Sequence, residues 1–321
     1  MAPATETFLR DEKDLSSIWD AYERGDRRAL ARLLTWAENP QYRPMLYQRL
    51  RSRTQQPGSF VLAITGSPGA GKSTLIGKLL PGIRQRGHTV AVLACDPRSP
   101  VSGGALLGDR IRMPVMVEDQ GVYIRSLAAP PGRQGIAENL DIRLALLERF
   151  GFDWIIVETI GVGQADVAIG DLVDCVTLLI PPESGDEIQW EKAGLLEVAD
   201  LVVVSKGDLP GAGRTAAQLQ QTLNLPGFPA KPILVVSAAK GTGLSDLVQQ
   251  LETSPRRRQQ EESQARRLLL LAQEILAQRF RERRELVAQL MEMARQQGWD
   301  DWQAASQLAR GLMANHAADS P

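Results

Sequence analysis

The sequence is poor in the residues from which metal and disulfide sites are built. It holds two cysteines and two histidines in 321 residues. Cys95 and Cys175 each lie in an apolar, strand-like stretch, so we expect buried free thiols and no disulfide. His88 and His316 stand far apart, and no His-rich tract or Cys-x-x-Cys occurs. This scarcity argues against a protein that carries soft metal ions, which need thiolate or imidazole ligands.

The sequence also lacks an excess of one charge and a long apolar run. Lys and Arg number 37 against 38 Asp and Glu, which argues against a general nucleic-acid binder. No apolar run approaches the ~20 residues that cross a bilayer. The N-terminus lacks the basic-then-apolar order of a signal peptide. We therefore expect a soluble cytoplasmic protein with no nucleic-acid or membrane partner.

The residue pattern of the chain changes at two points, which divide it into three segments. Residues 1–55 carry apolar residues at helical spacing, with Gly25-Asp26 between two runs, and predict an N-terminal helical extension. Residues 56–253 form the main domain. Residues 254–321 predict a charged C-terminal helical extension. It opens with Ser254-Pro255-Arg256-Arg257-Arg258, which we interpret as a solvated linker and not as a nucleic-acid contact.

Short apolar runs alternate with helical segments in the main domain. The strand candidates are 60–65, 90–95, 154–159, 175–180, 201–205 and 233–237. Near-continuous apolarity is typical of parallel strands buried on both faces. Helical segments such as 75–86 and 139–150 lie between them. The pattern predicts repeated βαβ units and hence a doubly wound, mostly parallel α/β sheet.

A glycine-rich loop follows the first strand candidate. Backbone N–H groups can crowd around phosphate oxygens only where no Cβ intrudes, and the helix that opens at about Lys72 adds its N-terminus. Lys72 is expected to reach the β and γ phosphates, and Ser73 to place its hydroxyl on Mg²⁺. The sequence thus predicts a P-loop that binds a nucleoside triphosphate, formed by Gly66, Ser67, Pro68, Gly69, Ala70, Gly71, Lys72, Ser73 and Thr74.

Acidic residues end two of the strand candidates. Asp96 and Glu158 fall at the edge where parallel sheets bind ligands, and Mg²⁺ is the expected partner, with a helix cap or turn as the alternative. Asp109, in a Gly-rich loop, either joins them or is a turn residue. Glu158-Thr159-Ile160-Gly161 resembles the Asp-x-x-Gly switch of GTPases. There Gly161 would offer its N–H to the γ phosphate and report which nucleotide is bound.

The choice of base is predicted from two later loops. Asp208, in Ser205-Lys206-Gly207-Asp208, can accept hydrogen bonds from the ring N–H and the exocyclic amine of guanine, which adenine cannot supply. The stem of Lys206 can lie against the base. Ser237-Ala238-Ala239 matches the last GTPase motif, whose backbone meets the guanine oxygen. Ser205 stands where Asn or Thr is usual, which removes about 1 kcal/mol of supporting hydrogen bonding.

Together these motifs resemble the MeaB/ArgK (MMAA) family of P-loop GTPases. The resemblance spans roughly 60–250 and includes GGALLGDR and ETIGVGQ, which are characteristic of that family. It implies a P-loop GTPase domain of the SIMIBI type. It also implies Mg²⁺-dependent GTP hydrolysis by a homodimeric chaperone of an adenosylcobalamin-dependent acyl-CoA mutase, which gates cofactor delivery and protects or reactivates the mutase.

The same resemblance assigns roles to single residues. It assigns catalysis to Lys72, Asp96, Glu158 and Gly161, and makes Asp96 the candidate for positioning the attacking water. It assigns magnesium binding to Ser73, Asp96, Asp109 and Glu158. It assigns guanine recognition to Lys206, Asp208, Ser237, Ala238 and Ala239. It also implies an additional switch that carries the nucleotide state to the partner, formed by Ser184, Gly185, Asp186, Glu187, Gln189 and Lys192.

Three other functions compete with this interpretation. A metal-delivery GTPase of the hydrogenase or urease type needs ligands that this chain lacks. A P-loop small-molecule or protein kinase has no use for the paired Lys-x-Asp and Ser-Ala-Ala motifs. A nucleotide-bound scaffold with negligible turnover is the third.

Overall fold

The computed structural model describes two compact units, Met1–Gln260 and Glu261–Pro321. The described residues are 15–39, 41–51, 58–97, 119–129, 139–159, 169–182, 190–225, 229–259, 265–266, 268–269, 272–273, 276–277, 279–280 and 283–314. Among them no helix is both long and apolar enough to cross a membrane.

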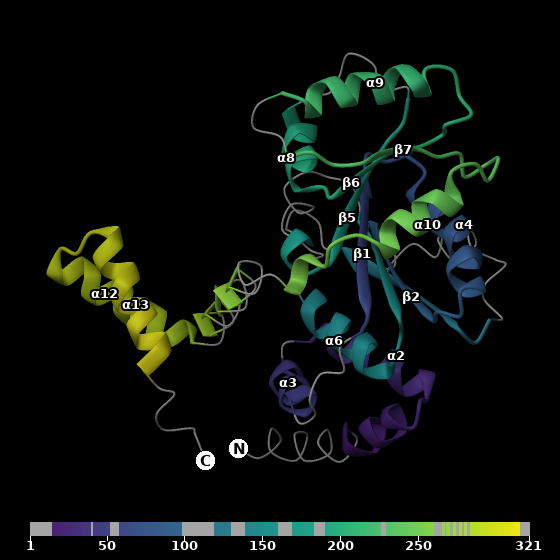
Figure 1. The fold of residues 1–321 in the computed structure, drawn as a ribbon. Coiled ribbons are helices and arrows are strands. Elements are labelled where there is room, and N and C mark those ends of the chain that lie inside the picture. The colour runs from purple at the N-terminus through teal and green to yellow at the C-terminus, as the bar shows by residue number, and fades with distance from the viewer. Residues whose placement is uncertain are drawn as a thin grey trace. The chain divides into compact units, whose positions relative to one another are not determined.

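A parallel sheet forms the centre of the first unit (Figure 1). Its seven strands lie in the order β3-β2-β4-β1-β5-β6-β7, and all neighbours pair in parallel. They are β1 Phe60–Gly66, β2 Val90–Pro97, β3 Val122–Ala129, β4 Trp154–Glu158, β5 Cys175–Ile180, β6 Leu201–Val204 and β7 Ile233–Val235. Six were predicted, and the doubly wound α/β fold is confirmed. β3, an edge strand, was missed.

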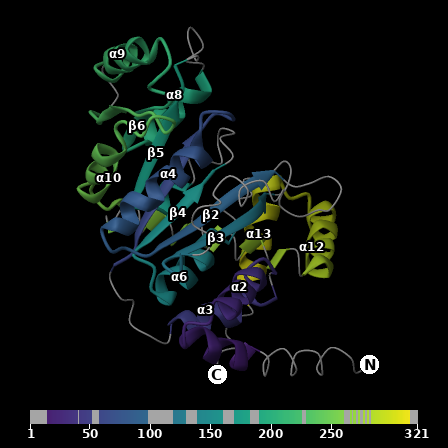
Figure 2. The same cartoon turned by 90° about the vertical axis from the view of Figure 1, so that its right-hand side faces the viewer.

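Alternate residues of each central strand face opposite sides of the sheet, so both faces are covered. On one side Val61 and Ala63 pack against helices α2 (Arg27–Trp36), α3 (Arg43–Arg51) and α6 (Leu140–Phe150). On the other, Leu62 and Ile64 pack against α4 (Lys72–Gln85) and α10 (Leu244–Glu252). Figure 2 shows α2, α3 and α6 gathered away from α4 and α10. Helices α8 (Trp190–Val198) and α9 (Ala212–Leu223) complete the layers.

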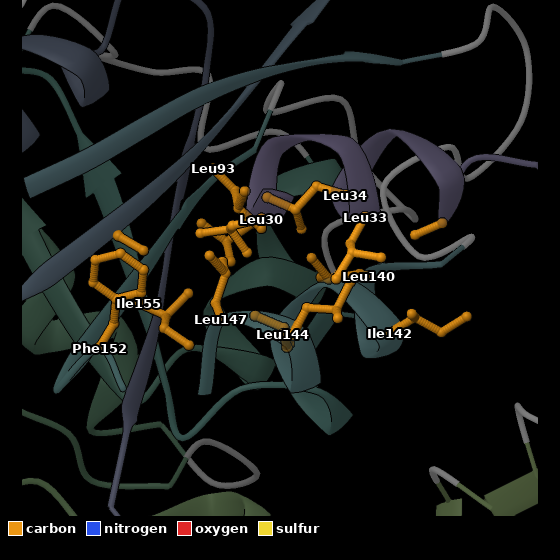
Figure 3. Close-up of a cluster of buried hydrophobic side chains, with 14 of the residues drawn as sticks. Leu30, Leu33, Leu34, Leu93, Leu140, Ile142, Leu144, Leu147, Phe152 and Ile155 are labelled. Carbon is orange, nitrogen blue, oxygen red and sulfur yellow. The ribbon is translucent and has the colours of Figure 1, made fainter. Parts of the chain in front are cut away.

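The N-terminal helices pack directly on the sheet's core. Leu30, Leu33 and Leu34 of α2 meet α6 in one apolar cluster, as Figure 3 shows. Asp26, which stands between the two apolar runs, caps α2, because its carboxylate accepts hydrogen bonds from the backbone N–H groups of Arg28 and Ala29. The apolar spacing in the described residues between 15 and 51 thus reflects a face buried on the sheet.

The basic stretch at 256–258 is not a solvated linker, and that prediction was wrong. Arg258 donates to the carboxylates of Glu148 and Asp174 at 2.5 and 2.9 Å. Arg257 opens the short 3-10 helix η3 (Arg257–Gln259) and pairs with Asp200 at 2.6 Å. Charge patterning alone does not distinguish a solvated run from one that meets carboxylates brought together by the fold.

The second unit contains α12 (Arg284–Gln297) and α13 (Asp301–Ala314), which pack against each other. Gly298 ends α12 with a left-handed φ of 67°, a conformation that favours glycine at the end of a helix. Several large apolar side chains in this unit are exposed, and Trp302 is 81% exposed.

Candidate nucleotide site

The P-loop runs straight from β1 into α4. Gly66 ends β1 with φ 144°, and a Cβ at this position would lie 2.4 Å from the carbonyl oxygen of Leu179 in β5. Gly71 caps α4 with φ 93°, in the left-handed region that favours glycine. These two glycines let the chain turn within five residues, so that the N-terminus of α4 opens towards a cavity.

Lys72 begins α4 and folds back over its own loop. Its ammonium donates to the carbonyl oxygens of Gly66 at 2.7 Å and Ser67 at 3.2 Å. The residue is only 7% exposed. The loop therefore holds a cation at the point where the sequence predicts phosphate binding.

Ser73 and Glu158 meet as predicted for a magnesium site. Glu158 ends β4 beside β1, and its Oε1 accepts a hydrogen bond of 2.6 Å from the hydroxyl of Ser73. Both residues are buried. A hydroxyl and a carboxylate are hard oxygen donors of the kind that Mg²⁺ prefers, and Mg²⁺ is commonly held by one or two protein ligands together with phosphates and water. The donor chemistry therefore fits the ion.

No group of three His, Cys, Asp or Glu side chains in the described part of the chain could hold a metal. The backbone of Asp96 lies in β2, two residues beyond Ala94, which pairs with Glu158. Asp96 thus reaches the same carboxyl edge, although its side chain is outside the described residues.

The base-recognition loops meet at Asp208. Its Oδ1 accepts a 2.5 Å hydrogen bond from the hydroxyl of Ser237, which also accepts the backbone N–H of Lys240. The hydrogen bond from Ser237 lowers the pKa of Asp208, which extends to lower pH the range in which this carboxylate is ionised. Lys206 has φ 52°, an uncommon conformation for a side-chain-bearing residue that is often found at functional loops.

One cavity of about 430 Å³ joins the phosphate and base elements. The P-loop lines one end with Gly69, Ala70, Gly71 and Thr74. The other end is lined by Ser205, Lys206, Asp208, Ala238 and Ala239. Motifs separated by more than 160 residues thus lie around a single space, as the order of the strands requires.

Ser205 lines the base end of this cavity. It is 6% exposed, and its hydroxyl finds no hydrogen-bond partner among the described residues. This agrees with the expectation that serine loses a supporting bond at this position. The hydroxyl of Ser237 was missed, because the motif predicts only a backbone contact there and does not reveal that the side chain holds Asp208.

Several predicted site residues lie outside the described residues. They are Asp109, Gly161, Ser184, Gly185, Asp186, Glu187 and Gln189. The backbone of Lys192 belongs to α8, but its side chain is not among those described. The phosphate and base motifs are thus brought together, and the switch residues stay predictions.

Comparison with known proteins agrees with this geometry. A relative from Pyrococcus abyssi is 42% identical over 212 residues, which make up 66% of this chain and 65% of that protein. The mouse protein called methylmalonic aciduria type A homolog, mitochondrial, is 34% identical over 74% of this chain and 62% of its own length. The chain thus spans somewhat under two thirds of each of these two relatives.

A solved structure and a family model complete the comparison. The crystal structure of a LAO/AO transport system kinase matches with a TM-score of 0.60 and 23% identity, over 94% of this chain and 98% of that one. It supports the predicted fold. The family model described as methylmalonyl-CoA mutase-associated GTPase MeaB matches residues 30–294. The chain accordingly belongs to the MeaB family of P-loop GTPases.

Proposed function

We propose that this protein hydrolyses GTP with Mg²⁺ and uses the reaction as a switch. The observation that carries the proposal is the single cavity, with a P-loop at one end and the ionised Asp208 at the other. A cavity of about 430 Å³ is within the usual range for a cofactor pocket. The family description as a GTPase supports the same assignment.

Guanine selection rests on Asp208. A carboxylate offers only acceptors, and guanine presents two neighbouring donors, whereas adenine presents an acceptor at the corresponding ring nitrogen. Ser237 holds Asp208 in place by its 2.5 Å hydrogen bond. The Lys206 stem and the backbone of Ala238 and Ala239 line the same end of the cavity.

Hydrolysis rests on positioning and charge. Lys72 and the N–H groups of the P-loop would hold the β and γ phosphates, and Ser73 with Glu158 would hold Mg²⁺. When bound, the ion neutralises charge that develops on the phosphate oxygens. Asp96 would orient water, Asp109 is a further candidate for the metal, and Gly161 would sense the γ phosphate. Since none of these is a strong base, we expect slow intrinsic turnover that a partner accelerates.

We further propose that the partner is an adenosylcobalamin-dependent acyl-CoA mutase. Support comes from the family description as mutase-associated and from the mouse relative. The segment that contains Ser184, Gly185, Asp186, Glu187, Gln189 and Lys192 would carry the nucleotide state to the mutase. The free, buried thiol of Cys175 fits a reducing compartment, so we propose the cytoplasm as its location.

A homodimer is proposed from the second unit. Leu268, Leu269 and Trp302 are 66%, 59% and 81% exposed there. Such side chains are expected to be covered by a second copy. Analytical ultracentrifugation of the full chain tests this, and a monomer at micromolar concentration would overturn it.

The decisive experiment follows phosphate release from GTP and from ATP, with and without Mg²⁺ and a purified mutase. We expect Mg²⁺-dependent release that favours GTP, rises with the mutase, and accompanies comigration of the two proteins. Rapid phosphate transfer from ATP to a metabolite would overturn the GTPase proposal. Unchanged mutase activity without comigration would overturn the chaperone proposal alone.

A further inference from the structure

Arg257 joins three elements at the amino end of the sheet. Its Nη2 donates to the carbonyl oxygen of Val198, at the end of α8, and to Oδ1 of Asp200, both at 2.6 Å. Its backbone N–H donates to the carbonyl oxygen of Asp174 at 3.0 Å. The side chain is 22% exposed. Arg257 is therefore held at both backbone and guanidinium, in a position outside the nucleotide cavity.

The guanidinium also packs on the 3-10 helix η2 (Ile169–Asp171). A Cβ at Gly170 would lie 2.8 Å from Nη1 of Arg257 and 2.9 Å from Cγ1 of Val198. No side chain fits at position 170 unless Arg257 or α8 moves. The backbone of η2, the guanidinium and the last turn of α8 are thus in direct contact.

The C-terminal end of α8 is fixed by two cations. The first cation is the guanidinium of Arg257, which donates to the carbonyl oxygen of Val198. The second is the ammonium of Lys231, which donates to the carbonyl oxygens of Ala199 at 2.7 Å and Glu197 at 3.2 Å, and to that of Leu196. Cations at a helix C-terminus satisfy its last carbonyls and interact favourably with its dipole. A shift of Arg257 would therefore alter one of the two anchors of α8.

The two elements that meet at Arg257 each follow a predicted switch in the chain. η2 begins a few residues after Gly161-Val162-Gly163-Gln164, and α8 begins directly after Gln189. We propose that Arg257 is a positioning residue that couples η2 to α8, so that a change in the position of η2 is passed through the guanidinium of Arg257 to α8. The proposal rests on the proposed nucleotide switch. It makes the start of the C-terminal extension part of the switch machinery.

Hydrogen–deuterium exchange of the full chain tests the coupling. We compare α8 amides in the GDP·Mg²⁺ form and in the form with a non-hydrolysable GTP analogue and Mg²⁺. In the wild type we expect exchange rates to differ by about threefold or more. In Arg257→Gln the difference should disappear, while nucleotide affinity stays within about twofold because Arg257 lies outside the cavity.

Arg258→Gln is the matched control. Arg258 pairs with Glu148 and Asp174, and among the described residues no hydrogen bond or ion pair joins it to η2 or α8. We expect this variant to lose thermal stability and to keep the nucleotide-dependent difference, which a merely structural role of Arg257 would not predict. If Arg257→Gln does not fold, Gly170→Ala perturbs the same contact from the other side and should also remove the difference.

Two results would overturn the coupling. One is a nucleotide-dependent difference that survives in Arg257→Gln or Gly170→Ala, and the other is its absence from wild-type protein that binds GTP. If the wild type instead fails to bind GTP in preference to ATP, it is the proposed function that fails. The binding measurement therefore separates the two failures.

Discussion

The two edges of the sheet use acidic residues in opposite ways. At the amino edge Asp153, Asp174 and Asp200 each stand directly before a strand. Each accepts a backbone N–H at or near the start of the neighbouring strand, from Thr89, Val61 and Val176 respectively. At the carboxyl edge Glu158 and Asp208 instead accept side-chain hydroxyls, from Ser73 and Ser237.

The difference separates structural carboxylates from those proposed for the nucleotide site. A backbone N–H at the amino edge has one fixed position, and Asp174 and Asp200 are further paired with arginines. A hydroxyl can rotate and can give its oxygen to a metal ion, so the carboxyl-edge pairs can change partners without unfolding the sheet. Residue type alone therefore does not separate the two groups of carboxylates, whereas the sheet edge does; at the amino edge Asp153 also accepts the hydroxyl of Thr89.

The largest effect is expected at the amino edge, from Asp174→Asn. Arg258, whose side chain is 16% exposed, would lose the charge of a partner that is 2% exposed. Breaking such a pair should cost about 3 kcal/mol of unfolding free energy, measured by urea titration. The folded fraction should keep its preference for GTP over ATP. The matched control Asp153→Asn, at an exposed site, should cost clearly less; equal losses would contradict the burial argument.

Lys72→Ala probes the phosphate end of the carboxyl edge. It removes the cation held by Gly66 and Ser67, so we expect GTP turnover to fall about 100-fold and γ-phosphate binding to be lost, with little change in thermal stability. Phosphate release and binding of a fluorescent GTP analogue measure this. Lys78→Ala, an exposed lysine on the same helix, is the control. Retained turnover in Lys72→Ala would refute the phosphate assignment.

Asp208→Asn probes the base end. The asparagine amide replaces one accepting carboxylate oxygen by a donating NH₂ group. Guanine therefore loses one hydrogen bond, and one of its N–H donors then faces another donor. The preference for GTP over ATP, taken as the ratio of dissociation constants, should fall about tenfold or more. Asp246→Asn, an exposed aspartate in the first turn of α10, should leave it unchanged. An unaltered ratio in Asp208→Asn would mean that the base is recognised elsewhere.

Ser237→Ala tests the hydroxyl–carboxylate pair at the carboxyl edge through the pH dependence of GTP affinity. The hydrogen bond from Ser237 lowers the pKa of Asp208, so the carboxylate and its guanine affinity persist as pH falls until that lowered pKa is reached. Without the bond the pKa rises towards its ordinary value, and GTP affinity should be lost at a higher pH. At neutral pH the change in affinity should be below about tenfold. Titration calorimetry at decreasing pH measures both, and Ser205→Ala should not move the midpoint.

The sequence predicted the strands whose own residues show a clear strand pattern. Central strands such as β1 and β5 are fully buried, so their unbroken apolarity identified them. β3 was missed because it contains Arg125 and Ser126 and lies at the sheet edge. There Arg125 donates to α2, at the carbonyl oxygen of Ala31 and the hydroxyl of Thr35. A polar strand whose partners come from the N-terminal helices shows no strand pattern of its own.

In the candidate site, too, local patterns were predictable and contacts between distant residues were not. Motifs of adjacent residues predicted two loops that the structure brings around one cavity, which Gly71, Thr74 and Asp208 line. The long-range contacts were not predictable, because they depend on pairings such as Arg258 with Asp174, 84 positions apart. The three consecutive arginines carry no sign of which carboxylate each one meets.

The row of aspartates at the amino edge also bears on how the strands find their alignment. Strands made of interchangeable Val, Leu and Ile can slide past one another by two residues and still bury apolar side chains. A slip of β5 against β1 would pull Asp174 away from the N–H of Val61 and leave a carboxylate among apolar groups. The buried Asp174 therefore penalises misregistered strands. The backbone hydrogen bonds that Asp153 and Asp200 accept favour the same single register for β4 and β6.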